Sequence, residues 1–186
     1  MYKIIAILGP SGCGKDTLVR ELFREPGQDY NKIILSTTRP MRENEDMNSY
    51  HFLAPFSLDK AKEENEFIIS SEYNGWFYGI SKSDLDENHI NVGVLSPDEL
   101  AQLEELDNVS IHAYYLMVPD KMRMLRQLNR EENPNVEEIA RRFLADKKDF
   151  KKFPLPGMMP LTNETIEQLG KNIQIIVGQN NLSDFE

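Results

Sequence analysis

The sequence has little cysteine and histidine and no long apolar run, and each scarcity removes a class of protein. One cysteine among 186 residues excludes an internal disulfide, and three scattered histidines show no metal-site spacing. No apolar stretch approaches the roughly 20 residues that a membrane helix needs. The first apolar segment begins at once, with no room for a signal peptide. We therefore expect a cytoplasmic protein with no membrane partner.

Basic residues are also scarce relative to acidic ones. Lys and Arg number 21 against 31 Asp and Glu, which leaves a net charge of −10. Such a surface argues against a general nucleic-acid binder, so any cations that hold an anionic substrate must be concentrated locally. The length favours one compact domain with a substantial core. We expect it to be a monomer or a homodimer.

Nine residues carry the clearest chemical signal. Segment 9–17 reads Gly-Pro-Ser-Gly-Cys-Gly-Lys-Asp-Thr, and it lies between an apolar run and a helix-like stretch. The spacing from Gly9 to Lys15 matches the phosphate loop G-x-x-x-x-G-K. Its glycines let backbone N–H groups point inward, while the helix start and Lys15 add positive charge. The next position is normally Ser or Thr, but here it is Asp16, with Thr17 one place late.

Apolar runs typical of buried parallel strands alternate with segments of helical periodicity. This alternation predicts an α/β fold with a mostly parallel sheet flanked by helices. The expected core strands cover 2–8, 32–36, 91–95, 109–118 and 158–161. The expected helices cover 16–24, 57–65 with Ser57 as cap, 81–87, 97–106 with Ser96 as cap, 120–130, one from 136 onward, and one ending near Gln179 with Thr162 or Asn163 as cap.

One region departs from the alternation. Two strand-like runs, 66–73 and 76–78, flank Asn74-Gly75, a strong hairpin signal. We therefore expect a small antiparallel unit inserted in the parallel fold. Just ahead of it, segment 36–42 places two arginines behind three hydroxyls. That set suits a phosphate, although a solvated loop can carry the same mixture.

A second arginine-rich region lies between two helices. Segment 131–135 breaks the helical periodicity, and the helices on either side of it bear arginines. Such a loop looks like a lid, while the alternative is a solvated helix face with snorkelling side chains. The arginines concerned are Arg123, Arg126, Arg130, Arg141 and Arg142.

Together these blocks resemble the guanylate kinase family of nucleoside monophosphate kinases over nearly the whole chain. The matching blocks are Gly9-Pro-Ser-Gly-x-Gly-Lys15, Ser36-Thr-Thr-Arg39-Pro-x-Arg42, Tyr50-His51-Phe52, Glu66-Phe67-Ile68, Gly75-x-x-Tyr78-Gly79, Arg126-x-x-x-Arg130 and Glu138 to Arg142. The resemblance implies a P-loop kinase with core 1–36, 80–128 and 138–186, a monophosphate-binding insert at 37–79 and a lid at about 129–137.

The resemblance also implies the reaction and the site. ATP would donate a phosphoryl group to a nucleotide monophosphate, with Mg²⁺ bridging the ATP phosphates and Asp16 as its candidate ligand. The ATP-binding residues would be Gly9, Ser11, Gly12, Cys13, Gly14, Lys15, Asp16, Thr17 and, near the adenine, Asn163. The monophosphate-binding positions would be Ser36, Arg39, Arg42, Tyr50, Tyr78, Ile69, Glu72 and Ile80. The catalytic residues would be Lys15, Arg130 and Arg142, with Arg126 assisting.

The base-reading half of the pattern is altered. Ile69 stands where the family has a glutamate that reads guanine, and Ile80 stands where it has a hydroxyl residue. The family's Asp-x-Asp is replaced by residues 94–96, Val-Leu-Ser. Isoleucine cannot accept the hydrogen bonds that guanine offers, and unpaired donors disfavour a base strongly. Glu72 or Asp98 could substitute, and a pyrimidine acceptor such as dUMP or dTMP stays open.

Two other activities remain as alternatives. A Gly-Lys-Asp loop ending is similar to that of ribose bisphosphate phosphokinases and of phage deoxynucleoside monophosphate kinases, and a carboxylate can ligate Mg²⁺. A sugar-phosphate acceptor would need no base pocket. The third reading is a non-catalytic guanylate-kinase-like binding module. Such modules usually lose the loop lysine or the lid arginines, whereas Lys15, Arg130 and Arg142 are all present.

Overall fold

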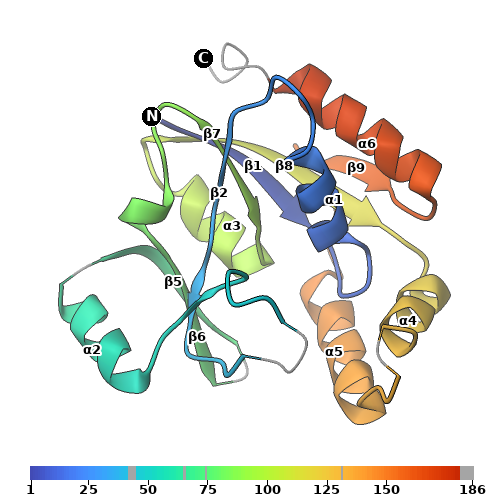
Figure 1. The fold of residues 1–186 in the computed structure, drawn as a ribbon, viewed down its shortest axis with the longest axis horizontal. Coiled ribbons are helices and arrows are strands. Elements are labelled where there is room, and N and C mark those ends of the chain that lie inside the picture. The colour runs from blue at the N-terminus through green and yellow to red at the C-terminus, as the bar shows by residue number, and fades with distance from the viewer. Residues whose placement is uncertain (42–44, 65, 74, 131, 181–186) are drawn as a thin grey trace.

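The structure is a computed structural model, and it describes residues 1–41, 45–64, 66–73, 75–130 and 132–180 (Figure 1). Two predicted positions, Arg42 of the monophosphate-binding segment and Asn74 of the hairpin turn, lie outside these ranges. None of the helices in the described ranges is long and apolar enough to cross a membrane.

The main sheet has five strands in the order β2-β7-β1-β8-β9, and every neighbouring pair is parallel. Its central strand β1 is apolar almost throughout and is buried on both faces, as a central parallel strand must be. The prediction of a parallel α/β sheet is therefore confirmed. The strands are β1 (Tyr2–Leu8), β2 (Tyr30–Lys32), β7 (Ile90–Val94), β8 (Val109–Met117) and β9 (Met159–Thr162).

Helices cover both faces of this sheet because β1 presents apolar side chains alternately to each side. Ile5 and Ile7 belong to a core cluster with α1 (Lys15–Leu22) and α6 (Ile166–Gln179), whereas Ile4 and Leu8 belong to a second cluster with α3 (Pro97–Glu104). Two further helices, α4 (Asp120–Leu128) and α5 (Val136–Asp149), follow β8. Figure 1 shows them side by side beyond the carboxyl ends of the strands.

A second sheet has the order β4-β3-β6-β5. Its long pair, β5 and β6, is an antiparallel hairpin whose turn contains Gly75 at φ +74°, so the predicted hairpin is confirmed. The sheet is nevertheless mixed rather than purely antiparallel, since β3 pairs parallel with β4. The elements are β3 (Ser36–Thr37), β4 (His51–Phe52), β5 (Phe67–Tyr73) and β6 (Trp76–Ser81), with helix α2 (Pro55–Glu63) between β4 and β5.

The predicted strand over 32–36 is wrong, because the chain passes from one sheet to the other within it. β2 ends at Lys32 in the main sheet, and β3 begins at Ser36 in the second. Ile33 and Leu35 are buried in the cluster that includes Ile80 of β6. The apolar run therefore reflects packing where the two sheets meet rather than one continuous strand.

The start of α3 agrees with the sequence prediction, whereas the starts of α2 and α6 differ from it. Ser96 caps α3, as predicted, and the structure shows that it forms a capping box with Glu99. Ser57 lies inside α2, which begins at Pro55, because proline suits the first turn of a helix. Thr165, not Thr162 or Asn163, caps α6, since β9 continues to Thr162. The helix expected at 81–87 is only a short 3₁₀ turn over Lys82–Asp84.

Candidate active site

The glycine-rich loop joins the end of β1 to the start of α1, and its glycines are required by conformation and by space. Gly9, Gly12 and Gly14 have φ of +144°, +81° and +95°, a range that L-residues with a side chain disfavour. A Cβ on Gly12 would lie 2.6 Å from the Arg123 carbonyl oxygen. One on Gly14 would lie 2.7 Å from Nδ2 of Asn163. The loop is thus seated closely between α4 and the β9–α6 connection.

Lys15 folds back over this loop. Its Nζ donates to the carbonyl oxygen of Gly9 at 2.5 Å and to that of Pro10 at 3.3 Å. Lys15 is half-buried at the first position of α1, Asp16 next to it is exposed, and Thr17 is half-buried. A helix N-terminus and an ammonium group at one loop attract an anion such as a phosphate.

The side chains of two loop residues, Ser11 and Cys13, are occupied by contacts within the protein. The Ser11 N–H donates to Asp146 Oδ2 at 2.8 Å, and its hydroxyl lies 3.4 Å from Oδ1. Cys13 is fully buried, and burial raises the pKa of its thiol. The Cys13 side chain therefore fills space as a neutral thiol, and only its backbone is available to a ligand.

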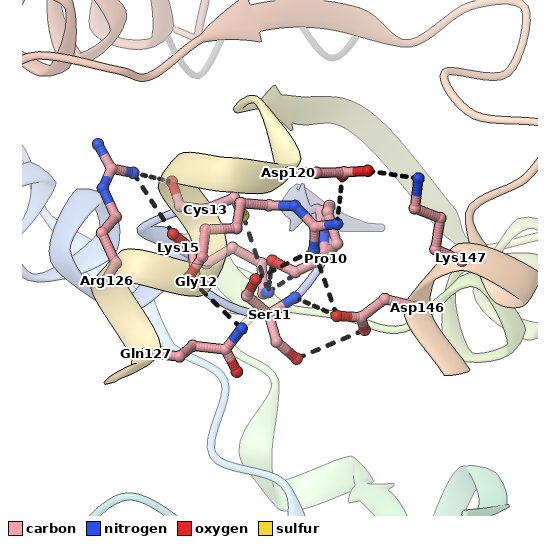
Figure 2. A network of polar contacts seen from close by, with 12 residues as sticks. Pro10, Ser11, Gly12, Cys13, Lys15, Asp120, Arg126, Gln127, Asp146 and Lys147 are labelled. Atoms are coloured by element: carbon pink, nitrogen blue, oxygen red, sulfur yellow. Dashed lines mark hydrogen bonds and ion pairs between the residues drawn. The ribbon is translucent and has the colours of Figure 1, made fainter. Parts of the chain in front are cut away.

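Arg126 and Asn163 brace the loop from the other side. The Arg126 guanidinium donates to carbonyl oxygens of Gly12, Cys13, Asn163 and Glu164 at 2.9–3.5 Å. Asn163 is buried, and its Nδ2 donates to the Cys13 carbonyl oxygen at 2.8 Å. Figure 2 shows Arg126 directed toward the loop at Gly12 and Cys13. Both residues thus tie the loop to the β9–α6 connection in this state.

The other two predicted catalytic arginines lie just beyond α4 and on α5. Arg142 donates to Glu138 at 2.8 Å, and Arg141 donates to the same carboxylate at 2.7 Å. Hydrogen bonds from Arg141 and then Arg142 lower the pKa of Glu138 to about 2. Arg130 is exposed beyond the end of α4. Within the described part of the chain, neither Arg130 nor Arg142 has a hydrogen bond to the phosphate loop.

The second sheet brings Arg39, Tyr50 and Tyr78 together. The guanidinium carbon of Arg39 lies 5.2 Å from the centroid of the Tyr50 ring, and the Tyr50 and Tyr78 centroids are 6.1 Å apart. Arg39 is 8% exposed, and its fork holds both carboxylate oxygens of Glu45 at 2.7 and 2.9 Å. Ser36 is buried on β3. Burial, with a smaller contribution from Tyr78, raises the pKa of Tyr50 to about 12, so its hydroxyl stays protonated.

Two of the predicted base-contacting positions, Ile69 and Ile80, lie in the core against which Tyr50 and Tyr78 pack. Ile69 and Ile80 face each other across β5 and β6 and are 3% and 0% exposed. Both belong to the core cluster that also contains Leu95 and Leu100. Glu72 is exposed and, three residues from Ile69, points to the opposite face of β5. The two isoleucines therefore lie on the same side of the hairpin as Tyr78, and Glu72 lies on the other side.

Glu99 is a polar group of this region that the sequence did not single out. It is 5% exposed, it accepts from the Ser96 N–H at 2.7 Å, and it accepts from the Ser71 hydroxyl at 3.2 Å. Ser71 pairs with Tyr78 across the hairpin. Burial raises the pKa of Glu99. The spacing from Ser96 to Glu99 indicates the helix start, but only the packing of α3 on β5 places this carboxyl near Tyr78.

A cavity of about 620 Å³ lies at the carboxyl ends of β8 and β9. Its lining includes Pro10, Arg123 and Asp146, and it contains none of the predicted acceptor residues. In the described ranges, no group of three acidic, histidine or cysteine side chains could hold a metal ion by itself.

A parallel sheet whose central strand runs directly into a glycine-rich, lysine-bearing phosphate loop defines an α/β P-loop kinase fold. The crystal structure of guanylate kinase from Anaplasma phagocytophilum has this fold, with a TM-score of 0.70 at 17% identity, covering 99% of this chain and 89% of that one.

Sequence relatives agree with the fold. The guanylate kinase of Sus scrofa is 28% identical over 162 residues, 84% of this chain and 81% of its own. That of Homo sapiens is 26% identical over 171 residues, 88% and 86% of the two chains. The family model described as guanylate kinase matches residues 1–180. The chain belongs to the guanylate kinase family, as its motifs predict.

Proposed function

We propose that the protein transfers the γ-phosphoryl group of ATP to a nucleoside or deoxynucleoside monophosphate and releases the diphosphate. The observation that carries this proposal is the pairing of two separate anion sites. The loop with Lys15 belongs to the main sheet, and the Arg39–Tyr50–Tyr78 cluster belongs to the second. Membership of the guanylate kinase family supports the same reaction. Such a transfer needs two phosphates brought in line with their repulsion neutralised.

On the donor side, backbone N–H groups within segment 12–17 and the Lys15 ammonium would bind the ATP phosphates, while the Ser11 N–H stays on Asp146. Mg²⁺ would enter with ATP as part of the substrate. Asp16 fits this ion because its exposed carboxylate starts α1 beside Lys15, and Mg²⁺ in phosphate sites commonly uses one or two carboxylates and keeps several waters. The ion neutralises phosphate charge when it is bound.

On the acceptor side, the monophosphate would replace Glu45 on the Arg39 fork. A planar guanidinium binds a phosphate with the same two-pronged geometry as a carboxylate. The protonated Tyr50 hydroxyl can donate to the phosphate, and Ser36 and Tyr78 lie on the neighbouring strands. The family pattern adds Arg42, which lies outside the described ranges.

We further propose that segment 37–79 is the monophosphate-binding insert and that about 129–137 is the lid. Closure would carry Arg130 and Arg142 toward the transferred group, where cations stabilise charge far more strongly once water is excluded. Before closure, Arg142 is hydrogen-bonded to the Glu138 carboxylate within the first two turns of α5.

The acceptor base is the open part of the proposal. Because Ile69 and Ile80 have no hydrogen-bonding group, we assign the reading of the acceptor nucleoside to Glu99, whose carboxyl is near Tyr78 through Ser71. A ribose-phosphate kinase is the second candidate, favoured by the lack of polar side chains at those two positions. The retained Lys15 and lid arginines disfavour a non-catalytic module.

The test is steady-state ADP release from Mg-ATP with GMP, dGMP, dUMP, dTMP and ribose 1,5-bisphosphate as separate acceptors. We expect turnover with at least one nucleotide and loss of that turnover in Lys15→Ala. Turnover with the sugar bisphosphate alone would establish the second candidate. If no acceptor is phosphorylated, the kinase proposal fails.

A further inference from the structure

Ser11 in the phosphate loop is held on all its polar groups by two helices. Its N–H and hydroxyl meet the Asp146 carboxylate of α5 at 2.8 and 3.4 Å. Its carbonyl oxygen accepts from the guanidinium of Arg123, on α4, at 3.2 Å. Asp146 and Arg123 also contact each other at 3.4 Å. Figure 2 shows Asp146 directed toward Ser11, with Asp120 and Lys147 paired nearby.

Arg123 is a buried cation with one donor unsatisfied among the described residues, and this arrangement is unfavourable in free energy. It is 3% exposed, and its Nε has no hydrogen-bond partner in the described part of the chain. An unsatisfied buried donor is unfavourable, and removal of either partner from a buried ion pair is strongly destabilising. Asp120 at 2.8 Å and the Phe143 ring at 4.9 Å complete its surroundings.

The held peptide also positions Lys15. The Ser11 N–H belongs to the Pro10–Ser11 peptide, whose other polar atom is the Pro10 carbonyl oxygen. That oxygen accepts from Lys15 Nζ at 3.3 Å and from the Cys13 N–H at 3.2 Å. Because a peptide unit is planar, Asp146 on one edge orients the group that Lys15 contacts on the other.

We propose that Asp146 and Arg123 form a clamp on Ser11 that holds the phosphate loop in its ATP-binding shape and couples it to α5, the helix that carries Arg142. Both are positioning residues, since they act on the loop and not on the reacting atoms. The inference rests on the proposed donor site but not on the identity of the acceptor. It gives the two helices that flank the lid a direct contact with the loop amides.

A carboxylate beside a phosphate loop could also do the opposite. It would then compete with ATP through charge repulsion, and its removal would tighten ATP binding. The geometry favours the clamp, because Asp146 engages Ser11 while Arg123 neutralises it at 3.4 Å. The two roles predict changes of opposite sign in the affinity for Mg-ATP.

The experiment is calorimetric titration of the full chain with Mg-ATP, without an acceptor, after thermal melting has shown which variants fold. We expect Asp146→Ala to raise the Kd roughly tenfold, as loss of a charged hydrogen bond would. Asp146→Asn should fall between wild type and Asp146→Ala, because its amide oxygen can still accept from Ser11 but its charge opposite Arg123 is lost. The control is Asp149→Ala, which removes an exposed acid at the end of the same helix.

An Asp146→Ala protein that binds Mg-ATP as tightly as wild type, or tighter, would overturn the clamp. If Asp146→Ala does not fold, Arg123→Lys decides, since it keeps a cation for Asp146 and Asp120 but loses the fork to Ser11. Unchanged affinity in that variant would equally overturn the proposal. If wild-type protein binds Mg-ATP but phosphorylates nothing, the proposed function is refuted, and the variants still decide the clamp proposal. If wild-type protein does not bind Mg-ATP, both proposals are refuted.

Discussion

Arg39 and Glu45 face each other through a two-pronged ion pair, with nitrogen–oxygen distances of 2.7 and 2.9 Å, beside Tyr50 and Tyr78. Both side chains are largely buried, at 9% and 14% exposed. The guanidinium that we assign to the acceptor phosphate is therefore already bound by a carboxylate of its own segment. A phosphate that binds Arg39 must displace the Glu45 carboxylate.

Glu45→Gln should lower the acceptor KM. The substitution removes the competing charge and leaves Arg39 available, so we expect a decrease of roughly threefold to tenfold, with the KM for ATP unchanged. The measurement is acceptor saturation at fixed Mg-ATP. Arg39→Ala removes the guanidinium itself and should raise the acceptor KM. A higher acceptor KM in Glu45→Gln would mean that the pair orients Arg39 for the phosphate instead of blocking it.

Gly12→Ala should destabilise the protein. The residue has φ of +81°, and its Cβ would lie 2.6 Å from a backbone oxygen, so the left-handed conformation alone costs about 1–2 kcal/mol. The measurement is the free energy of unfolding from urea titration. Gly170→Ala is the control, because it lies inside α6 with open space around it and should gain up to about 1 kcal/mol. Equal stability of the two variants would contradict the loop geometry.

These positions also show which features can be predicted from sequence. β1, the loop and α1 follow from contiguous residues, because apolar periodicity and glycine spacing are local signals. The contact of Ser11 with Asp146 joins residues 135 apart, and no periodicity reports it. The strand expected at 32–36 failed for a related reason, since burial of Ile33 and Leu35 comes from the junction of two sheets.

The roles of Arg126 and Ile69 show the same limit in the site. Sequence spacing placed both at the reaction by family pattern. The structure shows Arg126 on backbone carbonyls of the loop and Ile69 in the core, contacts that the family pattern does not specify. A side chain's partners depend on tertiary packing, so a motif position identifies a residue without identifying its contacts. Glu99 was missed because its position near Tyr78 depends on the packing of α3 on β5.

Glu99→Gln should raise the acceptor KM roughly tenfold and leave the KM for ATP unchanged. The substitution keeps the shape of the side chain but replaces one acceptor oxygen by a donor near Tyr78. The measurement is a pair of saturation curves, one for each substrate. Glu104→Gln, an exposed acid on the same helix, should match wild type in both. If the acceptor KM of Glu99→Gln is unchanged, Glu99 serves only as the capping-box partner of Ser96 at the start of α3.

Acid should weaken the start of α5 through Glu138. Hydrogen bonds from Arg141 and Arg142 lower its pKa from 4.5 to about 2 in the folded protein. A depressed pKa means that the stabilisation is present above about pH 4.5 and is lost as the pH falls toward 2. Glu138→Gln should therefore show a shallower loss of unfolding free energy over that window. A slope identical to wild type would show that the pair contributes nothing to stability.

The most direct measurement of the central claim is identification of the product by mass spectrometry after incubation with Mg-ATP and a mixture of nucleoside monophosphates. We predict that one or more monophosphates gain a single phosphoryl group as ATP becomes ADP, and that Lys15→Ala forms none. Wild-type protein that is folded and binds Mg-ATP, yet leaves every monophosphate unchanged, would contradict the account.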